Sequence, residues 1–271
     1  MCKIAQIDPS TYYKYLKRDN STRINLETDM KYIFNIMYFK TCGYRRMHSE
    51  LQDLGWHISE FKTREKMKGL GLYCDIRRMK RTSNHTDKKS ERKELKNILD
   101  RNFEATKPDE KYCTDTTEIE TVEEGVVNCS VIIDLFNLEP FGLAISKSCN
   151  TELTTKSVLK LHEKRKLKGS ILHSDQGVTY TSSKYGDLLN KLGIQQSLSR
   201  KGCPYDNCLM ENFWGTLKVE FLYKLHRKPQ NITELTEMVD NYIYFYVNVR
   251  KNSRLGNLTP AQYYKKYKDK E

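Results

Sequence analysis

The sequence lacks any apolar run long enough to cross a membrane. A membrane-spanning helix needs about 18 or more apolar residues. The two most apolar stretches, 125–136 and 242–249, are shorter than this and contain polar residues. The first residues, Met-Cys-Lys-Ile, also lack the apolar core of an export signal. We therefore expect a cytoplasmic protein that has no membrane partner.

The sequence also lacks the paired cysteines of common zinc modules. It has eight cysteines but no Cys-x-x-Cys pair, and Cys203 and Cys208 have no matching Cys or His pair nearby. A chain without an export signal usually keeps its cysteines reduced, so we expect thiols rather than disulfides or structural zinc. No internal repeat is visible. With 271 residues, 38% of them hydrophobic, the chain is long enough for a core domain and one or two smaller modules.

Positive charge is scarce only in the middle of the chain. Residues 1–100 hold 22 basic and 13 acidic side chains, and residues 151–271 hold 21 and 12, a net charge of +9 in each case. Residues 101–150 hold 4 basic and 10 acidic side chains, a net charge of −6. Basic flanks are typical of proteins that bind a phosphate backbone, and an acidic centre repels DNA unless cations bind there. The alternative is that the positive charge serves solubility alone.

The first third of the chain has the pattern of a small helical module. Apolar residues recur at helical spacing over 22–40, over 47–54 and over 59–68, and Gly55 separates the last two segments. Two short helices with a tight glycine-containing junction are typical of helix-turn-helix modules. The second helix and the arm that follows it are basic, with Lys62, Arg64, Lys66, Lys68, Arg77, Arg78, Lys80 and Arg81. We expect contacts to DNA from this segment, although a solvated helix face has the same charge pattern.

The pattern changes to that of a mixed sheet after Lys111. Runs rich in Val, Ile, Thr and aromatic residues predict strands, and segments of helical spacing follow them. The expected elements are strands at 112–119, 125–133 and 140–146, a helix at 151–166, a strand at 170–174, a helix at 182–192, a strand at 194–198, and helices around Glu211, at 232–249 and at 261–268. This order predicts an α/β fold with a ribonuclease-H-like mixed sheet and flanking helices, preceded by a small all-α helix-turn-helix-like domain.

Three acidic residues lie on separate elements of this predicted core. Asp115 lies inside a strand that would otherwise avoid Asp, Asp175 closes a short apolar strand, and Glu211 lies on a helix at the margin of its buried face. Phosphodiester chemistry needs an activated nucleophile and neutralised oxygens, which two divalent ions about 3.5 to 4 Å apart can provide. Hard ions such as Mg²⁺ prefer carboxylate oxygens. The three acids therefore predict a metal site that acts on DNA.

The helix that contains Glu211 places further residues beside it. At 3.6 residues per turn, Asn207, Glu211 and Lys218 share one side, so we expect Asn207 and Lys218 to reach bound DNA, whereas Asp206 points away. His173 precedes Asp175 by two residues and either contacts substrate or positions the strand. Asp134 and Glu220 are alternative acids. Any one of these acids alone is more often a turn or cap residue.

The chain resembles a known family at these positions. The matching residues are Thr114-Asp115, His173 through Gly177 with Tyr180-Thr181-Ser182, Gly202 through Asn207 with Glu211, and Leu217-Lys218. The span 111–260 is similar to the integrase-core transposases of bacterial insertion sequences, of the OrfB type, which are related to retroviral integrases. In that family 35 residues separate the second acid from the glutamate, as between Asp175 and Glu211, and a basic residue follows seven positions later, as Lys218 does.

The resemblance extends to both sides of the core. Residues 43–46 through 70–72 resemble the family's helix-turn-helix segment, and Tyr246, Arg250, Leu255 and Leu258-Thr259-Pro260 resemble its C-terminal signature. We therefore add Arg45, Arg46 and Arg250 to the expected DNA contacts. The expected division is a helix-turn-helix-like DNA-binding region at 1–81, a linker and connecting helix at 82–108, an integrase catalytic core at 109–225 and a C-terminal helical extension at 226–271.

The resemblance implies a reaction and its partners. Asp115, Asp175 and Glu211 would be both catalytic residues and ligands of Mg²⁺, or of Mn²⁺ in its place, with two ions bound. Water would cleave DNA at the ends of an insertion sequence, and the freed 3′-hydroxyl would attack another phosphodiester without a covalent protein–DNA link. The implied partners are the element ends, target DNA, an upstream OrfA protein or an OrfA–OrfB fusion, and further copies of this chain on DNA. The implied location is the bacterial nucleoid.

Three other interpretations remain open. Arg45-x-x-His48 and His162-x-x-Arg165 are found in a tyrosine-rich chain, as in a tyrosine recombinase, which would form a covalent protein–DNA adduct. A ribonuclease-H-like nuclease would cut DNA without joining it. A catalytically decayed copy would bind DNA only.

Overall fold

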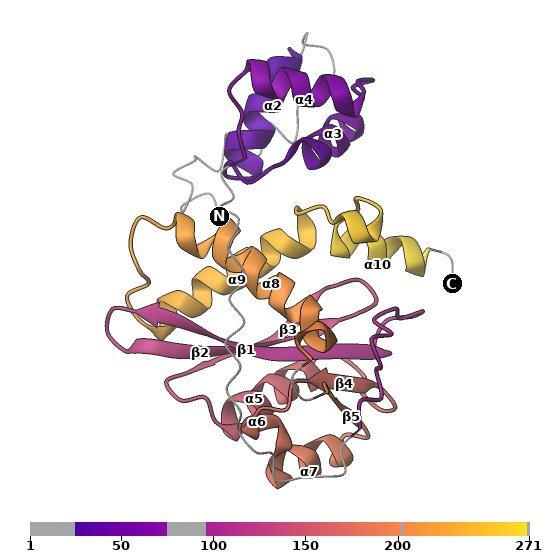
Figure 1. Cartoon of the computed structure of the whole chain (residues 1–271), viewed down its shortest axis with the longest axis vertical. Coiled ribbons are helices and arrows are strands. Elements are labelled where there is room, and N and C mark those ends of the chain that lie inside the picture. The colour runs from indigo at the N-terminus through magenta and orange to yellow at the C-terminus, as the bar shows by residue number, and fades with distance from the viewer. Residues whose placement is uncertain (1–24, 75–95, 201–202, 270–271) are drawn as a thin grey trace. The chain divides into compact units, whose positions relative to one another are not determined.

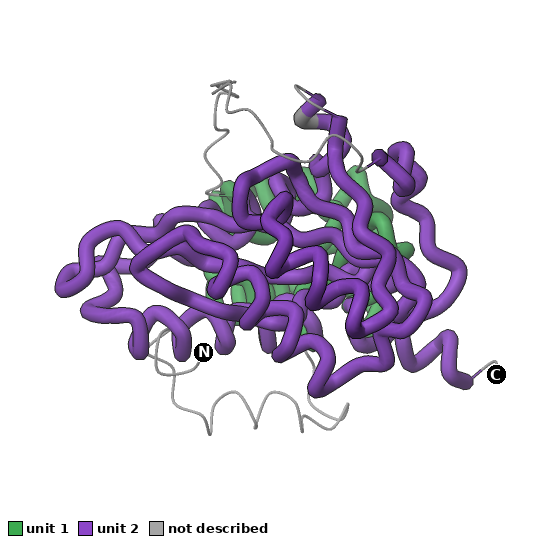
Figure 2. The backbone as a smooth tube through the Cα atoms, turned by 90° about the horizontal axis from the view of Figure 1, so that it is seen from below, with its two compact units in different colours: residues 1–79, 248–259 green, residues 80–247, 260–271 purple. Residues whose placement is uncertain are grey.

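The computed structural model describes residues 25–74, 96–200 and 203–269. The chain folds into two compact units (Figure 2). The first consists of residues 1–79 and 248–259, and the second of residues 80–247 and 260–271. The predicted basic arm with Arg77 and Arg78 and the predicted linker at 82–90 lie outside the described residues.

The first unit begins with a helix that changes its winding. Helix α2, Leu26–Tyr32, continues as a π-helical turn, η1, Ile33–Met37 (Figure 1). The side-chain oxygen of Asn25 accepts the backbone N–H of Glu27 at 3.1 Å and so caps the first turn. The helix predicted over 22–40 is thus confirmed over most of the residues that are described.

The two helices of the predicted helix-turn-helix pair follow. They are α3, Tyr44–Asp53, and α4, Glu60–Gly69. Gly55 lies between them with a φ of 84°, a left-handed conformation that glycine adopts without steric cost. Ser59 begins α4, because its hydroxyl accepts the N–H of Lys62 at 3.3 Å. Both predicted helices and the glycine-containing junction are therefore present.

A segment from the far end of the chain completes this helical unit. Residues Asn248–Thr259 belong to it, and Lys251 is 4% exposed. Its ammonium donates to the backbone oxygen and the hydroxyl of Ser49, at 2.9 and 3.0 Å, and pairs with Asp53 at 2.6 Å. Glu50 lies 3.6 Å away; burial raises the pKa of Glu50, and the charge of Lys251 opposes that rise. The segment is therefore tied to α3 by buried charge.

This packing divides the expected C-terminal extension at 226–271 between the two units. The boundaries expected from the sequence stay predictions, because compact packing does not by itself define a domain that folds alone.

The second unit is built on one five-stranded sheet. Its strands are β1 Lys111–Thr121, β2 Gly125–Asp134, β3 Pro140–Ser146, β4 Ile171–Ser174 and β5 Gln195–Leu198. They lie in the order β3-β2-β1-β4-β5, with antiparallel pairing in the first three strands and parallel pairing of β1, β4 and β5. The predicted mixed sheet is confirmed, and all five strands lie where the sequence predicts them.

Helices cover both faces of this sheet (Figure 1). On one face lie α5 Thr151–His162, α6 Val178–Thr181 and α7 Ser183–Lys191, and on the opposite face lie α8 Cys208–Glu220, α9 Ile232–Asn248 and α10 Pro260–Lys268. Asn150 caps α5 by accepting the N–H of Leu153 at 3.0 Å, and Ser182 caps α7 in the same way. The short helix α6 has no counterpart among the predicted elements.

Apolar side chains fill the space on both faces of the sheet. The cluster under α5, α6 and α7 consists of Tyr112, Ile132, Phe141, Val158, Leu161, Leu167, Leu172, Tyr180, Tyr185, Leu189, Ile194 and Leu198. On the other face, Phe213 of α8 contacts Tyr246 of α9, and Phe221, which directly follows α8, contacts Tyr242 of α9, each pair with ring centroids 5.4 Å apart. The predicted buried face of the helix that contains Glu211 is therefore confirmed. This packing fixes α8 above the central strand β1.

The chain before β1 also packs onto the sheet. The N–H groups of Ile98 and Leu99 donate to the hydroxyl of Ser197 on β5, at 2.9 and 3.0 Å. No helix is found in residues 96–108, and the rest of the expected connecting helix lies outside the described residues. In the part of the chain that the structure covers, no helix combines the length and the apolar character needed to span a membrane.

Candidate active site

Two of the predicted acids come together because their strands are neighbours. In the parallel pair β1/β4, Cys113 lies opposite His173. The same register continued by two residues places Asp115 beside Asp175, which follows β4 directly. Adjacent strands lie about 4.8 Å apart. The two carboxylates therefore lie side by side at one edge of the parallel part of the sheet.

Local backbone contacts hold each of these carboxylates. One oxygen of Asp115 accepts the N–H of Thr116 at 2.8 Å. One oxygen of Asp175 accepts the N–H of Gly177 at 2.9 Å in the turn after β4. A Cβ atom at position 177 would lie 2.9 Å from that same oxygen, so only glycine fits without displacing it. The Gly177 turn therefore determines where the Asp175 carboxylate points.

The third acid approaches from above the sheet. Glu211 lies exposed in the first turn of α8, while its neighbour Met210 is fully buried and anchors that turn. One turn earlier, Asn207 is 7% exposed, and among the described residues its side-chain oxygen has no hydrogen-bond partner. Two turns later, Lys218 is half-buried. The predicted side of α8 thus includes the carboxylate of Glu211, the ammonium of Lys218 and the buried side-chain oxygen of Asn207, unpaired within the described chain.

The charges of these residues act on one another. Burial, and next the charge of Asp175, raises the pKa of Asp115 to about 8, and the charge of Glu211 adds to this rise. The Thr116 N–H and Lys218 oppose it. Burial likewise raises the pKa of Asp175, against the effect of the Gly177 N–H. Since the charges of Asp175, Glu211 and Lys218 all affect the pKa of Asp115, these four residues belong to one electrostatic site.

The donor set fits a hard divalent cation. Within the described residues, no three His, Cys, Asp or Glu side chains lie close enough to hold a metal ion together as they stand. The three acids nevertheless offer only carboxylate oxygens, which Mg²⁺ and Mn²⁺ prefer. A cation would also offset the repulsion that raises the pKa of Asp115. The residues present therefore fit such an ion, and Asp115 and Asp175 are the pair nearest to forming its site.

Asp206, adjacent to Asn207, is engaged elsewhere. Its two oxygens accept bonds from Arg200, at 2.9 and 3.0 Å, from Arg101 at 2.7 Å and from Asn97 at 3.0 Å. The side chain is buried, and the hydrogen bond from Arg200 is the largest of the effects that lower its pKa. It ties the segment before α8 to the chain before β1. Asp206 is therefore a structural residue, in line with its omission from the predicted acids.

Comparison with known proteins identifies the family. Residues 105–204 and 211–267 match two family models, each described as an integrase core domain. An uncharacterized 31 kDa protein of insertion element IS600 from Shigella sonnei is 31% identical over 273 residues, 98% of each chain. The putative transposase InsK of insertion sequence element IS150 from Escherichia coli is 33% identical over 267 residues, 97% of this chain and 92% of that protein. The chain belongs to the insertion-sequence transposases with an integrase core.

A solved structure shares the transposase fold. A chain in the cryo-electron microscopy structure of the simian T-cell lymphotropic virus intasome in complex with PP2A regulatory subunit B56 gamma has a TM-score of 0.50 to this one. The two are 14% identical, and the match covers 83% of this chain and 72% of that chain. At this level of identity the similarity shows the fold alone, which agrees with the predicted ribonuclease-H-like sheet.

Some predicted site residues of the transposase are enclosed by its own structure. His173 is fully buried, and its two ring nitrogens lie 2.9 and 3.1 Å from the hydroxyls of Ser197 and Ser199. Of the two roles expected for His173, these contacts favour positioning of β4 over contact with DNA. Asp134 is buried and accepts N–H groups of the turn that follows β2 and of the segment before β1, and Glu220 accepts a bond from Tyr242 at 3.3 Å. Both alternative acids therefore have structural partners.

The predicted DNA contacts of the first unit differ in their exposure. Arg45, Lys62 and Arg64 are exposed, with Arg45 and Arg64 both stacked near the ring of Tyr44, at 5.3 and 5.7 Å. Arg46 is half-buried, and its guanidinium lies 5.1 Å from the Tyr38 ring. Arg250 is only 9% exposed. The exposed three are available to a DNA backbone, whereas Arg46 and Arg250 have at least part of their surface covered.

The sequence-based prediction omitted a loop of mixed basic and aromatic residues after α8. Residues 223–228 read Tyr-Lys-Leu-His-Arg-Lys, and all of them except Lys224 line a pocket that also includes Lys218. Basic residues interleaved with an aromatic one are a signal for nucleic-acid contact that could have drawn attention to this loop.

Proposed function

We propose that this transposase cleaves and joins DNA phosphodiester bonds at a site formed by Asp115, Asp175 and Glu211. DNA transposition and integration are the function of its family. The observation that supports this site most directly is the β1/β4 register, in which Cys113 lies opposite His173 and the two acids follow two residues later on each side. The response of the Asp115 pKa to both Asp175 and Glu211 adds the third acid.

The activity depends on a divalent cation in this proposal. Asp115, Asp175 and Glu211 would hold two such ions. Mg²⁺ is the proposed physiological ion, and Mn²⁺ can replace it. When bound, the ions supply charge neutralisation and activation of the attacking oxygen. They also stabilise the ionised form of Asp115, whose pKa the neighbouring acids raise.

The protein's own residues orient the DNA and the attacking group. Lys218 lies near enough to Asp115 for each to affect the other's pKa, so its ammonium can bind a phosphate beside the acids. Asn207 offers a buried side-chain oxygen to a donor in the same region. In the first step the nucleophile is water, and in the second it is the 3′-hydroxyl that the first step releases. No step requires a covalent bond between protein and DNA.

The proposed partners follow from the family. They are the two ends of the element, target DNA and further copies of this chain assembled on DNA, because cleavage at one end and joining elsewhere involve separate sites. An upstream OrfA protein, alone or fused to this chain, is the proposed source of end recognition. The proposed place of action is the bacterial nucleoid.

A product assay tests this function. The full-length chain is incubated with Mg²⁺ and a duplex that contains the inverted repeats flanking its gene, and strands are resolved on a denaturing gel. We expect both cut and joined products. Asp175→Asn should abolish both while leaving DNA affinity unchanged, and Asp187→Asn, which alters an exposed acid on α7, should have no effect.

Other outcomes of this assay point to other functions. Cuts without joined strands would indicate a nuclease, a covalent protein–DNA adduct would indicate a tyrosine recombinase, and DNA binding without any product would indicate a decayed copy. Full turnover by Asp175→Asn would contradict the proposed site.

A further inference from the structure

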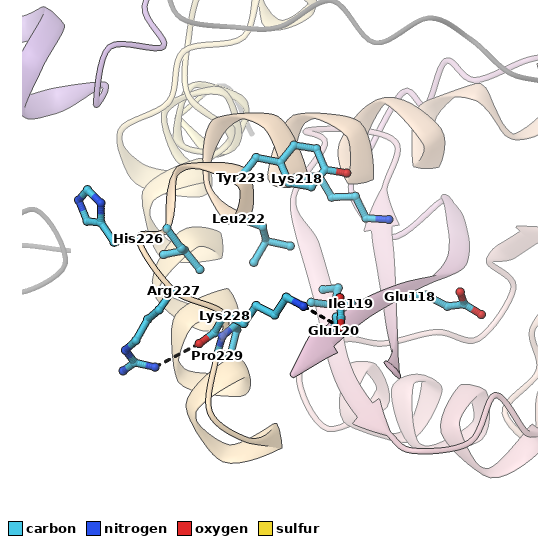
Figure 3. A pocket seen from close by; sticks show the side chains of 11 residues that line it. Glu118, Ile119, Glu120, Lys218, Leu222, Tyr223, His226, Arg227, Lys228 and Pro229 are labelled. Carbon is cyan, nitrogen blue, oxygen red and sulfur yellow. Dashed lines mark hydrogen bonds and ion pairs between the residues drawn. The ribbon is translucent and has the colours of Figure 1, made fainter. Parts of the chain in front are cut away.

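A pocket of about 410 Å³ lies where the chain leaves α8, and Lys218 is part of its lining (Figure 3). The C-terminal half of β1 forms one side of it, and the loop between α8 and α9 forms the other. Its charged and aromatic lining comes from the basic residues Lys218, His226, Arg227 and Lys228, from Tyr223, and from the acids Glu118 and Glu120. Its volume is within the range of about 300 to 1,000 Å³ for ligand sites, which suits a unit of nucleotide size rather than a whole duplex.

The loop that forms this pocket is held in place. The backbone oxygens of Pro229 and Gln230 accept N–H groups from Val122 and Glu123 at the β1–β2 turn, at 3.0 and 2.9 Å. The N–H at the start of α9 donates to Glu124 at 3.2 Å. Three bonds thus fix the far end of the loop, while α8 fixes its near end. A ligand that binds a preformed pocket loses little affinity, because the loop does not have to become ordered.

Lys218 connects the pocket to the acids. It lines the pocket; burial lowers the pKa of Lys218, and the charges of Cys129, Glu118 and Asp115 oppose that fall. Along β1, Glu118 and Glu120 follow Asp115 by three and five residues, which at 3.4 Å per residue is roughly 10 to 17 Å. A DNA strand with a phosphate every 3.4 Å along the helix axis would cover this distance in roughly three to five nucleotides. A DNA strand bound at the three acids therefore reaches the pocket within a few nucleotides.

The chemistry of the pocket suits an unpaired nucleotide. Tyr223 lies on a short 3-10 turn, η3, Leu222–Lys224, and is 61% exposed, so its ring is accessible to a ligand. Lys228 pairs with Glu120 at 2.7 Å, and both side chains are more than half exposed. Exposed ion pairs contribute little free energy, so a phosphate can replace Glu120 as the partner of Lys228. An exposed aromatic ring beside cations is the arrangement with which proteins bind single-stranded DNA.

We propose that this pocket binds an unpaired nucleotide of the DNA strand that leads into the active site. The base stacks on Tyr223, and the phosphates contact Lys218 and Lys228. The inference rests on the proposed function, because it takes the acids as the point to which the strand leads. It adds a single-strand contact to the DNA contacts expected from the sequence, which lie on α8 and in the first unit.

Fluorescence anisotropy with the full-length chain tests the pocket. The probes are a labelled oligothymidylate of about 12 nucleotides and the same strand annealed to oligodeoxyadenylate, both in EDTA so that no chemistry occurs. Tyr223→Ala should raise the Kd for the single strand about tenfold, the loss expected for one stacked base, and change the duplex Kd less than about twofold. Tyr223→Phe, which keeps the ring, should bind the single strand like the wild type. Tyr244→Ala removes a similarly exposed ring on α9 and is the matched control.

A second variant tests the phosphate contact independently. Lys228→Gln should lower the slope of log Kd against log salt concentration for the single strand by about 0.7, the value for one lost phosphate contact. An unchanged slope, or an unchanged single-strand Kd in Tyr223→Ala, would overturn the proposal. The proposal would also be overturned if Tyr223→Ala changed only the oligomeric state of the protein without DNA, measured by sedimentation. That result would assign the pocket to a protein partner.

Asp175→Asn separates this inference from the proposed function. It should lose strand transfer and keep the single-strand Kd. If Asp175→Asn remains active while Tyr223→Ala still loses single-strand affinity, the proposed active site is wrong and the pocket stands as a DNA site. If Tyr223→Ala binds normally while Asp175→Asn is inactive, the pocket proposal alone fails.

Discussion

At the scale of single residues, the cost of placing Asp115 inside the sheet indicates its role. Asp is unfavourable within strands, and burial near Asp175 raises its pKa to about 8. Residues whose pKa is shifted this far by burial and by a like charge are concentrated at functional sites. Asp206 shows the contrary case, because two arginines satisfy it and lower its pKa. The difference in partners, not the residue type, separates the proposed catalytic acid from the structural one.

This shift predicts how stability depends on pH. An unfolded Asp titrates near 3.9, so between about pH 4 and 8 the folded chain keeps a proton on Asp115 that the unfolded chain has lost. In EDTA the free energy of unfolding should therefore fall as pH rises through this window and level off above about 8. Urea unfolding above pH 6 reduces the contribution of Asp134, because burial raises the pKa of Asp134 to about 6. The slope should be smaller in Mg²⁺.

Asp115→Asn is the control for that experiment. It cannot ionise, so its free energy of unfolding should vary less with pH between about 6 and 8 than that of the wild type. An equal slope in the two proteins would show that Asp115 keeps an ordinary pKa.

At the scale of elements, strand ends and turns determine where the carboxylates lie. Strands β1 and β4 bring two of them together, and the turn at Gly177 directs one of these. The sequence predicted these strands because apolar runs and turn residues define them locally. It could not predict α6 or the contacts of His173, since a four-residue helix has too few residues for a period and the serine partners come from β5 and the residue just after it.

The Gly177 turn can be tested by adding one methyl group. Gly177→Ala would place Cβ about 2.9 Å from the Asp175 oxygen and force the carboxylate to move. We expect strand transfer to slow at least about tenfold, since a displacement of 1 Å at a reacting group can cost about a hundredfold, with little change in thermal stability. Gly215→Ala on α8 meets no atom within 4 Å and should be about as active as the wild type. Full activity of Gly177→Ala would show that the turn does not position Asp175.

At the scale of the whole molecule, the chain does not divide in sequence order. The helical unit expected at 1–81 includes residues 248–259, which deliver Lys251 to α3. No local pattern could reveal this, because the partners lie about 200 residues apart and each is an ordinary charged residue where it stands. Local patterns thus predicted most of the helices and strands and the three acids, and the family resemblance gave the same acids, but neither predicted which distant segments share a core.

The buried Lys251 gives a stability prediction at this scale. Lys251→Met leaves Glu50 buried without its cation and should destabilise the first unit by about 3 to 5 kcal/mol. Lys251→Met combined with Glu50→Gln should be markedly more stable than Lys251→Met alone, because the unpaired charge is gone. Urea unfolding followed by circular dichroism gives both values. Equal stability of the single and double variants would show that the unpaired Glu50 carboxylate does not cause the loss of stability.

The central claim is that Asp115 and Asp175 act in one site. Single-turnover strand transfer by Asp115→Asn, Asp175→Asn and the double variant, all in Mg²⁺ on one DNA substrate, tests it most directly. Residues that act as a unit give non-additive losses, so each single variant should lose about as much rate as the double variant. If instead the losses multiply in the double variant, or if either single variant keeps the wild-type rate, the two acids do not form one catalytic site.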